Sequence, residues 1–203
     1  MKRLLTAIFA ILLTVNANAQ FGIVGGITTA STRLKDVDVR GVTDYHAGIA
    51  YKVPLVLGFV FQPELLYNVK GGTVGEIVRT MDMKTFDFAA SYLELGTQLQ
   101  WGPNFEVARP YAFAEPFVGF AFKMEGSLNG WSGVNRFEYG VGFGFGVEVI
   151  NHVQVAVKYF WNLGPLFNEN GEFEAGNEAE RVATRAINDG YADGIQISAA
   201  IIF

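Results

Sequence analysis

The chain has 203 residues, of which 50% are hydrophobic, only 17% are charged and 24 are glycine. Soluble domains usually carry about 25% charged residues, so this composition favours contact with a membrane. The net charge of −5 gives no support for nucleic-acid binding. The absence of cysteine excludes disulfides, thiolate metal sites and lipid attachment at an N-terminal cysteine.

The first residues have the features of a secretory signal peptide. The segment begins with Lys2 and Arg3, continues with a short apolar core and ends in Ala17-Asn18-Ala19, the A-x-A form that signal peptidase cleaves. We therefore predict a signal peptide at 1–19, export through the general secretory route and a mature domain at 20–203. The alternative is a buried N-terminal helix. No later apolar run reaches the roughly 18 residues that a transmembrane helix requires.

Alternation of apolar with small or polar residues predicts eight strands in the mature chain. They are expected at 20–29, 45–53, 57–68, 88–101, 109–123, 136–149, 153–162 and 190–203. Three connections are short, and four are long: 30–44, 69–87, 124–135 and 163–189. This alternation of lengths is typical of bacterial outer-membrane barrels. The predicted fold class is all-β: an eight-stranded antiparallel up-and-down transmembrane β-barrel with short periplasmic turns and long outer loops.

The sixth predicted strand indicates which face of the sheet points inward. Gly140, Gly142, Gly144 and Gly146 occupy one parity, and aromatic or β-branched residues occupy the other. A water-facing surface would need many charged residues, which the small set does not supply. The narrow interior of an eight-stranded barrel suits small residues, and glycine there admits larger groups from the opposite wall. We therefore expect the apolar set to face lipid.

The fifth predicted strand is apolar at both parities. Because a lipid-facing carboxylate is costly, we place Glu115 inside. This choice sends three aromatic side chains into the lumen as filling: Tyr111, Phe113 and Phe117. Pro63 and Pro116 also lie within predicted strands, so each is expected at a bulge or at a missing ladder bond.

Tyrosine and tryptophan should gather at the two membrane interfaces. The sequence places Tyr45, Tyr67, Tyr92, Tyr139, Tyr159, Trp161 and Tyr191 near outer strand ends, and Tyr51, Trp101 and Tyr111 near periplasmic ends. The last residue, Phe203, closes an amphipathic strand. Such an ending resembles the C-terminal signal by which the assembly machinery recognises outer-membrane barrels.

By parity, the lumen is expected to hold a network of acidic and basic side chains. Its members are Lys52, Glu64, Glu94, Glu115, Lys123, Arg136 near the outer mouth, Glu138, Glu148 and Lys158. Buried charges must pair, so the structural interpretation is a polar plug that fixes strand register, and the functional one is a selectivity lining or proton path. We favour the plug because so narrow a lumen is filled. Glu64 and Glu94 are expected to lie close and to share a basic partner or a proton.

The histidines do not predict a catalytic or metal site. His46 and His152 belong at opposite membrane surfaces, so they cannot form a metal pair. Some eight-stranded barrels are lipid A-modifying enzymes with a His–Ser based site, for which Ser31 and Ser91 are the nearest conceivable nucleophiles. No spacing supports a triad. The acidic loop 163–189 lacks the calcium-loop pattern. We therefore expect no catalytic residue, metal or cofactor.

Several segments resemble the PorT-like outer-membrane β-barrel family of Bacteroidota. They are "FGIVGGITTA", "YHAGIAYKVPL", "FVFQPELLYNVKGG", "SYLELGTQLQW" and "RPYAFAEPFVGFAF". The stretch from Gln62 to Gly71 is the most specific, and the resemblance covers nearly the whole mature chain. It implies a small outer-membrane barrel and carries over no catalytic motif, since most members have no known activity.

Three functions remain open from the sequence. The first is a non-enzymatic scaffold in the cell outer membrane whose loops serve structure, adhesion or partner contact. The second is a narrow channel or a component of a transport or secretion system, and the third is a lipid A-modifying enzyme. The expected partners are outer-membrane lipid, the barrel assembly machinery through the C-terminal strand, and a protein or glycan at the outer loops. Nucleic acid is not expected.

Overall fold

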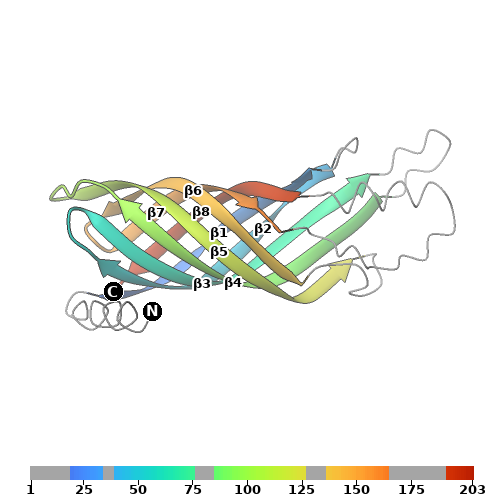
Figure 1. Ribbon diagram of the computed structural model, residues 1–203, viewed down its shortest axis with the longest axis horizontal. Coiled ribbons are helices and arrows are strands. Elements are labelled where there is room, and N and C mark those ends of the chain that lie inside the picture. The colour runs from blue at the N-terminus through green and yellow to red at the C-terminus, as the bar shows by residue number, and fades with distance from the viewer. Residues whose placement is uncertain (1–18, 34–38, 76–84, 127–135, 165–190) are drawn as a thin grey trace, which may run out of the picture.

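The computed structural model describes residues 19–33, 39–75, 85–126, 136–164 and 191–203, which form one closed antiparallel barrel (Figure 1). The strands are β1 (Gln20–Arg33), β2 (Val39–Pro54), β3 (Phe59–Gly75), β4 (Thr85–Trp101), β5 (Ala108–Gly126), β6 (Phe137–Val149), β7 (Val153–Asn162) and β8 (Tyr191–Ile202). Each strand pairs with its neighbours in sequence, and β1 closes against β8. The predicted fold class and strand order are confirmed.

Several strands are longer than predicted at the end that carries the long loops. β3 continues to Gly75, and β2 begins at Val39. The first connection between described strands is therefore 34–38, much shorter than the predicted 30–44. Pairing continues through polar positions such as Thr73 opposite Asp87, because backbone hydrogen bonds do not require apolar side chains. The apolar alternation used for prediction ends earlier than the sheet does.

The apolar face of the sheet points outward, as predicted. In β6 outward and enclosed positions alternate, and the large apolar side chains occupy the outward ones, where Phe145 is 76% exposed. Glu138 and Glu148 on the same strand are buried inside. An outer surface of aliphatic and aromatic side chains around a polar interior is the arrangement that a lipid environment requires.

The glycine row of β6 makes room for rings from the adjacent strand. A Cβ on Gly140 would lie 2.4 Å from the Phe117 ring, and one on Gly146 would lie 2.4 Å from the Tyr111 ring. Both rings belong to β5, where Phe117 pairs with Gly140 and Tyr111 pairs with Gly146. The groups that fill the glycine row here come from the neighbouring strand, and the expectation of the opposite wall is corrected for these rings.

Pro63 and Pro116 each lie beside a gap in one ladder. The β2–β3 pairing passes from Ala50–Glu64 to Val53–Phe61 without a register shift, and the gap includes Pro63. The β4–β5 pairing has the same kind of gap at Pro116. Proline has no N–H to donate. The predicted missing ladder bonds are therefore found, and neither proline lies at a register shift.

Candidate functional site

The lumen is the candidate site, because most of the charged side chains buried in the described residues converge there. Four basic and five acidic side chains inside the barrel are each no more than 7% exposed. They are Lys52, Lys70, Arg109 and Lys158, with Glu64, Glu94, Glu115, Glu138 and Glu148. The charges form two groups, one toward each end, with a single ion pair between them.

The long-loop cluster is centred on Lys70 of β3. Its ammonium lies 2.7 Å from Glu94 Oε2 and 2.7 Å from Glu138 Oε1. Asn68 donates to Glu94 at 3.2 Å, and Asn162 donates to Glu138 at 2.9 Å. The carboxylates are thus held in place by neutral donors as well as by the cation.

Aromatic rings enclose the same ammonium group. The Lys70 Nζ atom lies 5.0 Å from the ring centres of Phe117 and Phe160 and 5.4 Å from that of Tyr92. A cation within about 6 Å of a ring face is attracted to it. Lys70 therefore joins the charged and aromatic parts of the lumen, and side chains from β3, β4, β5, β6 and β7 meet around it.

A central ion pair lies between the two clusters. Lys158 donates to Glu115 Oε1 at 2.6 Å. The other carboxylate oxygen, Glu115 Oε2, and the Gln196 Nε2 atom are buried and have no hydrogen-bond partner in the described part of the chain. Buried polar atoms of this kind are usual positions for ordered water.

The short-turn cluster contains one ion pair and a set of glutamines. Lys52 pairs with Glu148, which Gln154 also approaches at 2.9 Å. Arg109 Nη1 lies 3.7 Å from Glu148 Oε2 and donates to Gln100 at 2.9 Å. The amides then bond to one another: Gln100 to Gln62 and Gln98, and Gln62 to Gln154 in both directions.

Glu64 belongs to this amide set and not to an ion pair. Gln62 donates to its Oε1 atom at 2.8 Å, and Gln98 donates to the same atom at 3.0 Å. No described basic group lies within ion-pair distance of Glu64. The prediction that Glu64 and Glu94 share a basic partner is wrong, because Glu94 shares Lys70 with Glu138. The alternative, a shared proton, stays a prediction.

His46 lies in a hydrogen-bonded chain beside the Lys70 cluster. Its Nδ1 atom is 3.1 Å from Thr28 Oγ1, which donates to Asn68 Oδ1 at 3.0 Å. Because the Thr28 proton points to Asn68, His46 Nδ1 is the donor to Thr28. His46 Nε2 then accepts from Ser198 Oγ at 3.0 Å. The serine beside His46 is therefore Ser198, which had not been considered. Ser91 instead bonds to Tyr67, and the Ser31 side chain lies outside the described residues.

One predicted lumen residue, Lys123, lies outside it. Lys123 is exposed because the β4–β5 register shifts between Ser91 and Tyr92, so that Phe122 is skipped and the parity reverses. Arg136, just before β6 begins, is exposed, and its place near the outer mouth stays a prediction. The other seven predicted members face inward, namely Lys52, Glu64, Glu94, Glu115, Glu138, Glu148 and Lys158.

Some of the tyrosines and tryptophans predicted at the membrane interfaces lie on the outer face, and others lie in the lumen. Large exposed fractions are found for Tyr45, Tyr51, Trp101, Tyr139 and Trp161, while Tyr67 and Tyr159 are half-buried on the outer face. Tyr92 and Tyr111 are each only 4% exposed and fill the lumen. Their predicted assignment to the interfaces is wrong. The inward placement of Tyr111 agrees with its parity, which is that of Glu115. The Tyr191 side chain lies outside the described residues, as do residues 1–18 of the predicted signal peptide and most of 163–189.

Two central cations were absent from the predicted network. Lys70 was missed because the third strand was expected to end at residue 68. Arg109 had the same parity as Glu115 on one predicted strand, so the alternation could have identified it. The glutamines share the same inward parity, but their mutual bonds depend on the register between strands.

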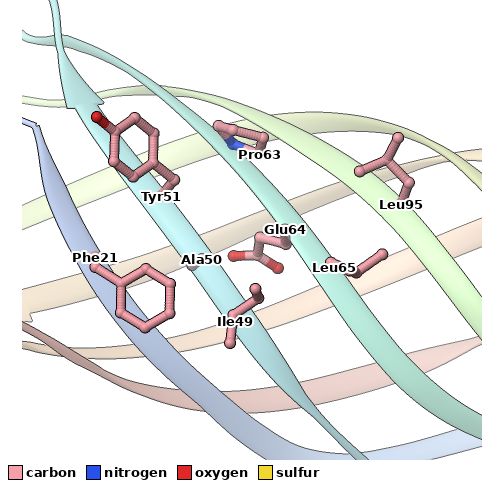
Figure 2. Close-up of a pocket in the computed structure, with 8 residues that line it drawn as sticks. All are labelled: Phe21, Ile49, Ala50, Tyr51, Pro63, Glu64, Leu65 and Leu95. Carbon is pink, nitrogen blue, oxygen red and sulfur yellow. The ribbon is translucent and has the colours of Figure 1, made fainter. Parts of the chain in front are cut away.

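A small pocket opens on the outer wall at the Pro63 gap (Figure 2). It has a volume of about 180 Å³ and is lined by Phe21, Ile49, Ala50, Tyr51, Pro63, Glu64, Leu65 and Leu95. In the close-up the Glu64 carboxylate lies between the ribbons of β2 and β3. The lining of the pocket is almost entirely apolar, so it suits a hydrocarbon chain and not a polar ligand.

The described residues contain no group of three or more acidic, histidine or cysteine side chains that could hold a metal ion. Within the same ranges, no helix has the length and hydropathy needed to span a membrane.

Comparisons with known proteins agree with this architecture. The structure is similar to that of OprG from Pseudomonas aeruginosa, with 14% identity over 91% of this chain and 96% of that chain and a TM-score of 0.53. Also found were Neisserial surface protein A (11% identity, 92% and 99% coverage, TM-score 0.48) and Ail of Yersinia pestis (11%, 92% and 99%, TM-score 0.45). At such identity the OprG likeness shows the fold alone. No curated protein matched.

A family model decides the assignment. The model described as "Outer membrane protein beta-barrel domain" matches residues 13–168, which is more than half of the chain. This match and the lipid-facing exterior locate the protein in the outer membrane. The chain belongs to the outer membrane protein beta-barrel domain family.

Proposed function

We propose that the protein is a non-enzymatic scaffold that holds its long loops at the cell surface for structural, adhesive or partner-binding roles. The observation that supports this role best is the filled lumen. Lys70 is held between two carboxylates and three rings at one end, and amides bond across the barrel at the other. A barrel whose interior is occupied by its own side chains has its loops available for recognition.

The protein's family group and its route of export can be stated more specifically. We assign the chain to the PorT-like group of Bacteroidota on the segments quoted above, with export directed by residues 1–19. The assembly machinery would recognise the final strand through Phe203, whose N–H donates to the Phe21 carbonyl at 2.7 Å and whose ring is exposed. The outer-loop partner would be a protein or a glycan.

Single-channel recording tests the scaffold against the narrow channel. The mature protein is inserted into planar bilayers beside a wide porin as positive control. We expect no reproducible conductance steps, since ion pairs and amides occupy the lumen. Regular steps that depend on protein concentration would support the channel instead.

Surface cross-linking followed by affinity isolation tests the role of the loops. The wild type is compared with a variant in which residues 165–190 are replaced by a short glycine–serine linker. The β7–β8 pairing from Val153–Ile201 to Trp161–Asp193 should hold the barrel together, so folding should persist while the cross-linked partner is lost. A partner captured equally by both would place recognition elsewhere.

The enzyme alternative rests on the contact between His46 Nε2 and Ser198 Oγ at 3.0 Å. A base beside a hydroxyl is one requirement for nucleophilic catalysis. His46 is only 1% exposed, however, and its other ring nitrogen is occupied by Thr28. We therefore interpret this pair as structural. Lipid A mass spectra from cells with and without the protein should be identical.

A further inference from the structure

The three short connections present a group of apolar side chains at one end of the barrel. They are residues 55–58 between β2 and β3, 102–107 between β4 and β5, and 150–152 between β6 and β7. We call their most exposed large apolar members the turn patch: Val56, Leu57, Phe105, Val107 and Ile150. The exposed fraction of these side chains ranges from 64% for Phe105 to 85% for Leu57.

The turn patch is held as one surface by hydrogen bonds between the connections. Gly102 N–H donates to the Gly58 carbonyl at 3.2 Å, which joins the first connection to the second. Ile150 N–H donates to the Val107 carbonyl at 2.9 Å, which joins the second to the third. The buried Arg109 also donates to the Gly58 carbonyl at 3.2 Å. The three connections that carry the apolar side chains are therefore bonded to one another.

Backbone conformation indicates that these side chains are positioned at a cost. Leu57 has a φ of 60° and Ile150 a φ of 53°, both in the left-handed region. This region favours glycine or asparagine, and a β-branched residue there is a strong outlier. Glycine or asparagine would relax both turns, yet the chain has large apolar residues that point away from the barrel.

The connections carry little charge. Glu106 is the only residue in the three segments with a formal charge at pH 7, and His152 is the only other ionisable side chain. Trp101 and Tyr51, both exposed, lie just inside the turns and lead into the apolar outer wall. The turn patch is therefore continuous with the face that contacts lipid.

The height of the apolar outer wall differs from strand to strand. On β2 the outward apolar run extends from Tyr45 to Tyr51, and on β8 from Ile195 to Phe203. With a rise of about 3.3 Å per residue and a tilt of about 40°, these runs span about 15 and 20 Å, while the outward run of β6 from Phe137 to Val149 spans about 30 Å. Outer-membrane barrels usually present an apolar band about 25 Å tall. Residues 55–57 continue directly from β2 and extend its apolar surface toward that height.

We propose that the turn patch is a lipid-binding surface that inserts into the headgroup–acyl boundary of the leaflet on the short-turn side. The apolar turn residues extend the band beyond β2, where the apolar run on the strand is short. Leu57 and Ile150, on connections that are bonded to one another, anchor this end of the barrel at a set depth. The partner is the lipid surface, and binding needs no second protein.

Because the chain has no native cysteine, single cysteines can report the depth of each position. Leu57→Cys and Ile150→Cys are labelled with an environment-sensitive fluorophore and reconstituted into phospholipid vesicles with bromines near the headgroup or deep in the acyl chain. Phe145→Cys, at the middle of the outer wall, is the lipid-exposed reference. Each labelled chain unfolded in urea without lipid is its own water reference.

We expect blue-shifted emission at both turn positions and stronger quenching by the shallow bromines than by the deep ones. Phe145→Cys should show the opposite preference. Water-like emission without quenching at both turn positions in correctly folded protein would overturn the proposal. Labels that are water-exposed in vesicles but shielded in isolated outer membranes would also overturn it, and would indicate a protein partner.

A second pair of variants tests the side chains without a label. Leu57→Asn and Ile150→Asn keep a residue that tolerates the left-handed conformation, so both should fold. If lipid contact is the role of the patch, the double variant should insert into vesicles several-fold more slowly than the wild type, while its unfolding in detergent is unchanged or delayed. Unchanged insertion would contradict the proposal.

Discussion

The two ends of the lumen are stabilised differently. The long-loop cluster places one ammonium group between two carboxylates and three aromatic rings. The short-turn cluster distributes its contacts over four glutamines, with the Lys52–Glu148 pair and Arg109 at its edge. Losing one member should therefore cost much more in the first cluster than in the second, because removal of Lys70 leaves two buried charges uncompensated.

Substitution of Lys70 should have the largest effect. We expect Lys70→Met to lower the free energy of unfolding by about 3–5 kcal/mol, the usual cost of breaking a buried ion pair. Urea unfolding in lipid vesicles, followed by the gel-mobility difference between folded and unfolded barrel, would measure the loss.

The matched control is the triple variant Lys70→Met, Glu94→Gln, Glu138→Gln, which removes the uncompensated charges as well. It should recover much of the stability. If the single and triple variants were equally unstable, the rings and not the charges would account for the role of Lys70.

Filling the glycine row should have the next largest effect. Ala at Gly146 would place a Cβ 2.4 Å from the Tyr111 ring, and overpacking of this kind costs about 1–3 kcal/mol. Gly25→Ala is the matched control, because its Cβ would meet its nearest neighbour, the His46 carbonyl, at 3.8 Å. Equal unfolding midpoints for the two variants would show that the Tyr111 ring moves aside freely.

A single amide substitution should cost less than loss of Lys70. Gln98→Leu removes one of two donors to Glu64 and the acceptor that Gln100 uses at 2.9 Å. Since Gln62 still donates to Glu64, we expect a loss of about 1–2 kcal/mol, measured by the same unfolding assay. A loss as large as that of Lys70→Met would remove the distinction between the clusters.

The smallest effect is expected at Ser198. Ser198→Ala removes one hydrogen bond to His46, and the net contribution of such a bond is about 1 kcal/mol. His46 keeps its bond to Thr28. The lipid A profile of cells that carry this variant should match that of wild-type cells, and a change that depends on Ser198 would revive the enzyme hypothesis.

Alternation predicted the fold well because lipid outside and a narrow lumen inside impose opposite requirements on successive residues. The same parity placed Glu115, Glu138 and Lys158 inside, where the structure has them. It failed at Lys123, since one skipped residue reverses the parity and the sequence has no marker for the skip. It missed Lys70 because the apolar pattern ends before the strand does.

Contacts across the lumen could not be predicted from the sequence. Lys70 and Glu138 are 68 residues apart, and Lys52 and Glu148 are 96 apart. Their meeting depends on the stagger between strands, which the alternation of one chain does not encode. Tyr92 illustrates a second limit: a tyrosine near a strand end satisfies the interface rule whether its ring points to lipid or to the lumen.

The positions of the ion pairs have a consequence for the order of barrel assembly. Every ion pair found in the described lumen joins residues of β2 to β7. The inward side chains described on β1 and β8, such as Val24, Thr28, Ala200 and Ile202, are all uncharged. The ion pairs of the central strands can therefore form before β1 pairs with β8 and closes the barrel. The first and last strands then pair through positions whose inward side chains are uncharged. Closure of the barrel therefore does not require an unpaired charge to be desolvated.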